Sequence, residues 1–218
     1  MNTVGFKKDV PVFETLLSSK DIYRGTGRSL KVPSVHIFLR EFLTDFSAGS
    51  LKSTGNPLDV AIDGEGFFKI ETERGDRYTR RGNFAINQEN ILVTSEGYPV
   101  LGKGGKIIID GEDVVINSGG EVIIDDSVKG TIQVVGFTST SSLKKDRDGL
   151  YAFLGEENQI EDVENSQIKQ GLLESSNVNT VKEMTNMIEV LRTYETYQKV
   201  IQVLDEISSK SINKVGHV

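Results

Sequence analysis

Cysteine and tryptophan are absent from this 218-residue sequence, and proline occurs only four times. Without cysteine, the chain forms no disulfide, no thiolate metal site and no cysteine nucleophile. Without tryptophan, and with aromatic residues at 7%, the composition disfavours an aromatic platform for binding carbohydrate. No run of about 18 apolar residues is present, so the sequence predicts no insertion into a membrane. The net charge of -7 disfavours nucleic acid, whose phosphates require clustered lysine and arginine.

The composition that is present favours a folded protein with many tight turns. Twenty-two glycines accompany the four prolines, and charged residues make up 26% of the chain. The first eight residues contain no apolar segment ahead of a small-residue cleavage site, so we expect no Sec signal. If the protein leaves the cytoplasm, we expect it to use another route.

The spacing of apolar and turn residues divides the sequence into three parts. Residues 1–50 carry short apolar pieces interrupted by Gly25, Gly27 and Gly49, which predict an extended N-terminal segment with loops. Residues 51–172 alternate short apolar runs with Gly, Asn and Asp turns every 8–12 residues, which predicts an antiparallel β domain. We expect residues 50–155 of this domain to fold alone. Residues 173–218 predict a long C-terminal helix, so the fold class is mainly β.

The β domain contains eleven candidate strands. They are 58–62, 66–72, 77–79, 84–86, 91–94, 99–101, 106–109, 114–116, 121–124, 131–137 and 150–153. The pair Asp110-Gly111 predicts a hairpin that joins the runs 107–109 and 114–116. Asn90 follows the turn residues 87–89 and is expected to take the left-handed conformation that glycine would otherwise supply.

The C-terminal helix is predicted by its start signal and its apolar spacing. Glycine is absent from Leu172 to Val215, Thr180-Val181-Lys182-Glu183 has the pattern of a capping box, and Gly216 is a plausible stop. Apolar or small residues then follow a 3-4 spacing: Met187, Val190, Tyr194, Tyr197, Ile201, Leu204, Ser208, Ser211 and Val215. Met184, Ile188, Leu191, Val200, Val203 and Ile207 widen this stripe. The spacing predicts coiled-coil packing on another helix; the alternative is a helix folded back on its own β domain.

Motifs that suggest chemistry have simpler structural explanations. Residues 97–104 resemble a phosphate-binding loop, but Gly104 replaces the required Ser or Thr and a strand follows instead of a helix. Asp63 and Asp110 each precede glycine and are interpreted as turn residues, without the alternation of a calcium loop. His36 and His217 have no metal-binding spacing, and no nucleophile motif supports a Ser-His-Asp triad through His36. We therefore predict no catalytic site, no metal and no cofactor.

Three stretches together resemble the bacterial flagellar basal-body rod proteins. The first is Asn-Thr-Val-Gly-Phe-Lys at 2–7. The second is 55–68, followed by 78–84 and 92–102. The third is 173–179, with 183–188 and 192–195 after it. The resemblance spans nearly the whole chain. Within the family, the length and residues 145–151 are most similar to proximal-rod subunits, then to distal-rod subunits. Met1 stands almost at the first motif, so we expect the family's preceding N-terminal helix to be missing.

The resemblance implies a structural subunit of the bacterial flagellum, located in the basal-body rod that spans the periplasm and used for motility. Its terminal helices would pack into an inner coiled-coil tube, with the β domain outside. Partners would be copies of itself, other rod and hook subunits, and the flagellar type III export apparatus. The expected assembly interface comprises Asn177, Val178, Asn179, Met187, Val190, Tyr194, Tyr197, Ile201 and Leu204. An alternative is a secreted β-domain module that binds carbohydrate or protein.

Overall fold

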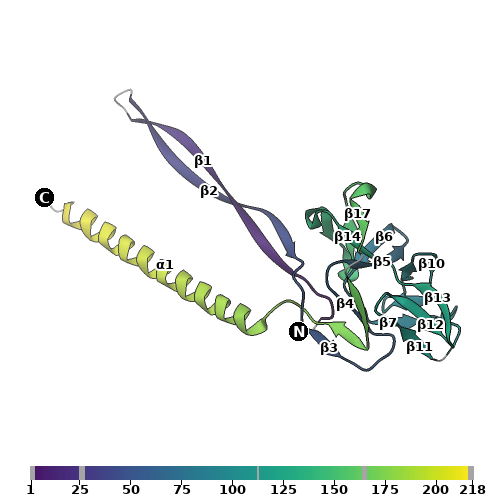
Figure 1. Ribbon diagram of the computed structural model, residues 1–218. Helices are drawn as coiled ribbons and strands as arrows, with labels where there is room; N and C mark the ends of the chain where they lie inside the picture. The colour runs from purple at the N-terminus through teal and green to yellow at the C-terminus, as the bar shows by residue number, and fades with distance from the viewer. Residues whose placement is uncertain (1–2, 25–27, 112, 164–165, 216–218) are drawn as a thin grey trace. The chain divides into compact units, whose positions relative to one another are not determined.

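The computed structural model describes residues 3–24, 28–111, 113–163 and 166–215, with side chains omitted for 18–24, 28–34 and 212–215 (Figure 1). The chain forms two compact units, Asn2–Asn177 and Val178–Val218. The first is built from antiparallel β-sheets and the second from one helix, so the fold is mainly β, as the sequence predicts. Gly25, Gly27, Gly216 and His217 lie outside the described residues. In the described ranges, no helix is both long and apolar enough to cross a membrane.

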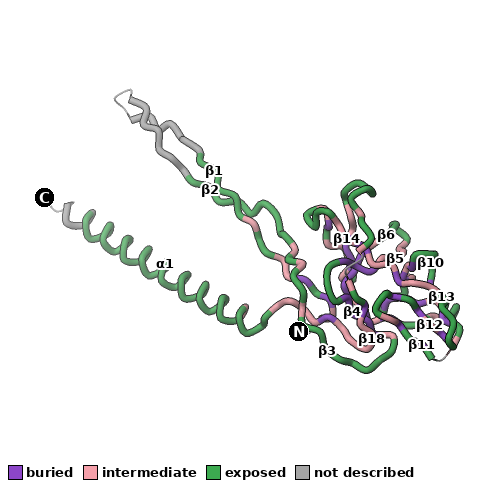
Figure 2. The backbone as a smooth tube through the Cα atoms, viewed as in Figure 1, coloured by how far each residue is buried: buried purple, intermediate pink, exposed green. Residues whose placement is uncertain are grey.

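Residues near the N-terminus form a long hairpin where the sequence predicts only extended segments and loops. Strands β1 (Lys8–Arg24) and β2 (Arg28–Asp45) pair antiparallel, with a bulge where the register shifts between Val12 and Phe13. Directly opposed residues share a face, as Phe13 does with Leu39. Figure 2 shows that most of the residues on these strands whose burial is described are exposed. Phe13 and Leu17 are 62% and 79% exposed.

A six-stranded antiparallel sheet forms one part of the β unit, in the order β15-β16-β6-β5-β14-β17. Its strands are β5 (Phe67–Thr72), β6 (Gly75–Thr79), β14 (Val134–Phe137), β15 (Leu143–Lys145), β16 (Tyr151–Phe153) and β17 (Ile160–Asp162). Three 3-10 turns lie between them: η1 (Thr140–Ser142), η2 (Arg147–Gly149) and η3 (Glu157–Gln159). Phe67, Tyr78 and Tyr151 are buried in an aromatic core on this sheet.

Smaller sheets surround a second, larger apolar core. One has three strands: β11 (Val114–Ile116), β12 (Glu121–Ile124) and β13 (Ser127–Thr131). The others are pairs: β7 (Phe84–Ile86) with β8 (Leu92–Thr94), β9 (Leu101–Gly102) with β10 (Gly105–Lys106), β4 (Val60–Asp63) with β18 (Gln167–Gln170), and β3 (Leu51–Ser53) with β19 (Leu172–Glu174). Ile107, Val122 and Ile168 are among the residues buried in this core.

The hairpin predicted at Asp110-Gly111 is wrong. Strand β11 pairs with β12 instead, while the backbone N–H of Leu92 donates to Ile107 O at 2.9 Å and that of Ile109 donates to Asn90 O at 2.7 Å. Four residues separate the two apolar runs, and an Asp-Gly pair favours a two-residue turn. The predicted left-handed conformation of Asn90 is confirmed by its φ of 60°. Residues 103–104 join β9 to β10, so the segment resembling a phosphate loop is a turn between strands.

The helix α1 (Thr180–Val215) covers the predicted C-terminal helical region, but its cap lies one residue earlier than expected. The backbone N–H of Lys182 donates to Asn179 Oδ1 at 3.1 Å, and that of Glu183 donates to Asn179 O at 3.0 Å. These bonds make Asn179, rather than Thr180, the N-cap residue. Asparagine and threonine both favour this position, so residue preference alone does not distinguish Asn179 from Thr180.

Candidate assembly site

A buried ion pair joins the two ends of the β unit. Lys7 Nζ lies 2.6 Å from Glu174 Oε1, and both side chains are 1% exposed. Lys7 Nζ also donates to Ser47 O at 2.8 Å, while the backbone N–H of Gly49 donates to Glu174 Oε1 at 2.7 Å. Burial lowers the pKa of Lys7, and the bond to Glu174 opposes that effect. For a buried pair without any other partner, removing one member costs about 3–5 kcal/mol, because the other charge remains buried alone.

Arg80 is the third charged residue of this cluster. Its Nη1 lies 3.6 Å from Glu174 Oε2, its Nη2 donates to Gly64 O at 2.9 Å, and its guanidinium lies over the Phe67 ring at 5.2 Å. Burial lowers the pKa of Arg80, but a guanidinium stays protonated because its ordinary pKa is above 12. Among the described residues, two buried atoms of this cluster have no hydrogen-bond partner, Arg80 Nε and Glu174 Oε2. The ionic cluster Lys7–Glu174–Arg80 thus contains two cations and one carboxylate.

Backbone contacts hold the N-terminal segment against the last strand. The N–H of Gly5 donates to Glu174 O at 2.8 Å, and the N–H of Ser175 donates to Ser50 O at 2.8 Å. Gly5 has a φ of 61°, and a Cβ there would lie 2.7 Å from the backbone nitrogen of Arg81. A larger residue at position 5 would therefore meet both backbone strain and a steric clash.

The base of the β1–β2 hairpin is fixed by Asn177 and Lys145. Asn177 Oδ1 accepts from the backbone N–H of Lys8 at 2.9 Å, and Asn177 Nδ2 donates to Asp45 O at 2.8 Å. Lys145 Nζ donates to Asp9 Oδ2 at 2.9 Å and lies 4.2 Å from the centre of the Phe6 ring. Asn177, which the sequence predicts as an interface residue, therefore ties the two hairpin strands to the end of the β unit.

The three sequence stretches singled out above meet in this cluster. Lys7 comes from the stretch 2–7, Arg80 from 78–84 and Glu174 from 173–179. Sequence reasoning missed the cluster because its members are far apart along the chain and none has a distinctive local spacing. The available signal was a charged residue in each of three separate motifs. Their convergence shows that these motifs share a structural role within one chain.

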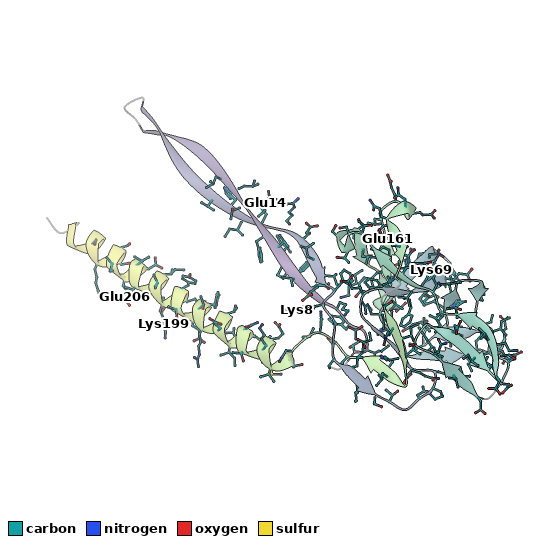
Figure 3. The ribbon with its side chains drawn as sticks, in the orientation of Figure 1. Lys8, Glu14, Lys69, Glu161, Lys199 and Glu206 are labelled. Carbon is teal, nitrogen blue, oxygen red and sulfur yellow. The ribbon has the colours of Figure 1, made fainter. Side chains whose placement is uncertain are left out.

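The other predicted interface residues lie on or before α1. Asn179 caps the helix, and Val178 before it is partly buried. The side chains of Met187, Val190, Tyr194, Tyr197, Ile201 and Leu204 are between 57% and 67% exposed. Val190, Tyr194 and Tyr197 line a shallow, mainly apolar hollow along the helix. Figure 3 shows side chains projecting from α1, among them Lys199 and Glu206.

The residues considered for chemistry lie apart from one another. His36 is exposed on β2, with its ring centroid 6.1 Å from that of Phe38. Asp110 pairs with Lys129 at 3.0 Å, and this bond lowers the pKa of its carboxyl. Among the residues that the structure describes, no three His, Asp or Glu side chains are placed to hold a metal ion.

Comparison with known proteins places this arrangement in a family. Residues 61–124 match the family model described as "Flagellar hook protein FlgE/F/G D1 domain", and residues 169–214 match "Flagellar basal body rod FlgEFG protein C-terminal". The flagellar basal-body rod protein FlgG of Bacillus subtilis is 35% identical over 234 residues, which cover 98% of this chain and 88% of that protein. The chain belongs to the flagellar basal-body rod protein family.

Two further relatives also match most of this chain. The flagellar basal-body rod protein FlgF of Caulobacter vibrioides is 38% identical over 183 residues, covering 80% of this chain and 72% of that protein. The flagellar hook-basal body complex protein FlhO of B. subtilis is 30% identical, covering 100% of this chain and 89% of that protein. Arg80 lies in the D1 match and Glu174 in the C-terminal match of this rod-family chain, so the ionic cluster joins the two matched regions.

Proposed function

We propose that this chain is a structural subunit of the bacterial flagellar basal-body rod that assembles through α1. Family membership supports the rod role, and the exposed apolar stripe on α1 supports the mode of assembly. Each large apolar side chain taken from water contributes about 1.5–3 kcal/mol, so the six stripe residues favour burial against another helix. Coiled-coil packing with a helix of a copy or a related rod subunit would bury them.

The distribution of apolar residues on α1 favours more than one neighbour. Val203 is 54% exposed and lies two residues after Ile201, which places it about 200° around the helix from the stripe. Ile207 and Val200 likewise widen the apolar surface beyond the stripe, with exposures of 55% and 50%. A helix that is apolar on several sides favours burial among several others. This pattern suits a position in the wall of a tube of helices.

The cellular setting follows from the same role. We place the chain in the rod part of the flagellar basal body, where it would cross the periplasm with other rod and hook subunits. Export through the flagellar type III apparatus, without a Sec signal, suits a chain that contains no cysteine. The same role requires no bound nucleic acid, no cofactor and no insertion into a membrane.

A structural role also predicts the absence of a chemical activity. Asp63 is the last residue of β4 and lies opposite Gln167 in the strand pairing, and the Asp110 carboxylate pairs with Lys129, so each residue has a structural position. Replacing Asp63 or Asp110 is expected to alter folding or assembly instead of a reaction rate. A hydrolase activity that Asp63→Asn abolishes in a folded protein would contradict the proposal.

The proposed function is tested in the cell by two variants of equal charge change. Ile201→Asp with Leu204→Asp adds two negative charges to the stripe, whereas Lys103→Asp changes the charge by the same amount in the exposed turn between β9 and β10, outside α1. In a strain that lacks the native copy, we expect the double variant to abolish swimming and to be missing from purified basal bodies. The Lys103→Asp variant should retain both. Normal swimming by the double variant would overturn the proposal.

A further inference from the structure

Glu174 faces two buried cations with a single carboxylate. Its Oε1 bonds Lys7 and the backbone of Gly49, while its Oε2 lies 3.6 Å from Arg80 Nη1 without a hydrogen bond. Among the described residues, Arg80 Nε is the other atom of this cluster without a hydrogen-bond partner. A small displacement of the carboxylate toward Arg80 would bring Oε2 within hydrogen-bond distance of Nη1, and a hydrogen bond between a guanidinium and a carboxylate is among the stronger ones in proteins.

We propose that Glu174 is a positioning residue that exchanges between Lys7 and Arg80. In one state the N-terminal segment is docked and Lys7 holds the carboxylate. In the other state Lys7 is withdrawn and Arg80 holds it, so the buried charge always keeps a partner. The exchange links two segments: whether residues 5–8 are docked would affect the conformation of residues 174–177, which precede α1 in the sequence. Every contact lies within one compact unit, so the inference does not depend on the assembly role.

The surrounding contacts make this exchange a coupled movement. The N-terminal segment is tied to the last strand by Gly5 N–H on Glu174 O, and Asn177 binds the backbone of Lys8. The loop before β3 is tied to the same carboxylate through the N–H of Gly49. When the carboxylate moves to Arg80, Gly49 loses its acceptor. The position of one side chain therefore determines whether two segments distant in sequence stay attached.

A thermodynamic cycle in the full-length chain tests whether Lys7 and Arg80 share the carboxylate. Lys7→Met and Arg80→Met each leave Glu174 with one cation, whereas the double variant leaves it buried with none. Each substitution raises the unfolding equilibrium constant by some factor. We expect the factor for the double variant to exceed the product of the two single-variant factors by about tenfold or more. Adding Glu174→Gln to the double variant removes the unpaired charge and should recover most of this loss.

If the two contacts were independent, the increase in the unfolding equilibrium constant of the double variant would equal the product of the two single-variant increases. That result would overturn the inference. Failure of Lys7→Met alone to fold would also overturn it, because Arg80 should then take over the carboxylate. Urea denaturation followed by circular dichroism supplies these constants. Lys103→Met, in the exposed turn between β9 and β10, is the matched control and should change little.

Amide hydrogen exchange of Lys7→Met tests the movement itself. We expect the Gly49 amide to exchange at least about tenfold faster than in the wild type, because its acceptor has moved to Arg80. The amide of Phe68 in β5 should keep its protection, and Lys103→Met should change neither amide. An unchanged Gly49 amide in folded Lys7→Met would show that the carboxylate stays in place, which contradicts the exchange.

Discussion

Burial sets the ionisation of two tyrosines in the aromatic core. Burial raises the pKa of Tyr78 to about 12, with a smaller contribution from Asp76, and burial likewise raises the pKa of Tyr151. An unfolded tyrosine titrates near pH 10. Stability from these phenols is therefore fully present below about pH 10 and is lost as the pH rises toward the folded values, because only the unfolded chain releases its protons readily.

Tyr78→Phe should reduce the pH dependence of stability in alkaline solution. Wild type should lose stability between about pH 10 and pH 12, and the variant should lose on the order of 2 kcal/mol less over that interval. The lowered pKa of Lys7 changes stability with pH in the opposite direction. It does so equally in both proteins, so its effect cancels in the comparison. Urea denaturation midpoints at several pH values supply the measurement. Parallel pH profiles for the two proteins would show that the pKa of Tyr78 is the same in the folded and the unfolded chain.

Local conformation was predictable for some single residues, while partnerships over long distances were not. Asn90 takes its left-handed conformation because turn geometry depends on a few adjacent residues. Glu174 has no such local signal. Its partners Lys7 and Arg80 are set by the packing of three separate segments, and the sequence around each residue does not reveal where the others lie.

The helix α1 and the β1–β2 hairpin differ in how clearly their sequences predict them. For α1, the 3-4 spacing extends over many turns and identifies the helix clearly. In β1 and β2, apolar residues occur on both faces, and most of those described are exposed. The alternation of apolar and polar residues that identifies a half-buried strand is therefore missing. A two-stranded hairpin is marginal in water alone, so we expect this one to depend on its anchored base.

The N-cap of α1 provides a prediction for the helix itself. Asn179→Ala should destabilise the first turn by about 1 kcal/mol and increase exchange of the Lys182 amide, because that N–H loses its side-chain acceptor. Asn179→Asp should retain the protection. Thr180→Ala is the comparison variant and should have a much smaller effect. Equal effects of the alanine variants at 179 and 180 would disagree with the observed cap.

In the whole β unit, strands from both ends complete the sheets. Strand β18 pairs with β4 and places Ile168 in the larger core at 4% exposure, and β19 pairs with β3. The turn spacing in the sequence favours an autonomous unit over 50–155, because the later strands are short and lie next to the helix signal. The observed pairing instead favours a unit that extends to about residue 177.

Two fragments distinguish these boundaries. We expect residues 50–177 to melt cooperatively with β-type circular dichroism, whereas residues 50–155 should not, since they lack β18 and leave the core around Val60 uncovered. Thermal denaturation of both fragments supplies the measurement. A cooperative melt of the shorter fragment at an equal temperature would show that β18 is dispensable.

Assembly through α1 is the central claim, and sedimentation of the purified chain over a range of concentrations tests it most directly. We predict that wild type and Lys103→Asp form dimers or larger species as concentration rises, while Ile201→Asp with Leu204→Asp remains monomeric with its β unit folded. The contradicting result is a wild type that stays monomeric at every concentration while its segment 180–215 resists proteolysis. The helix would then be docked on its own chain.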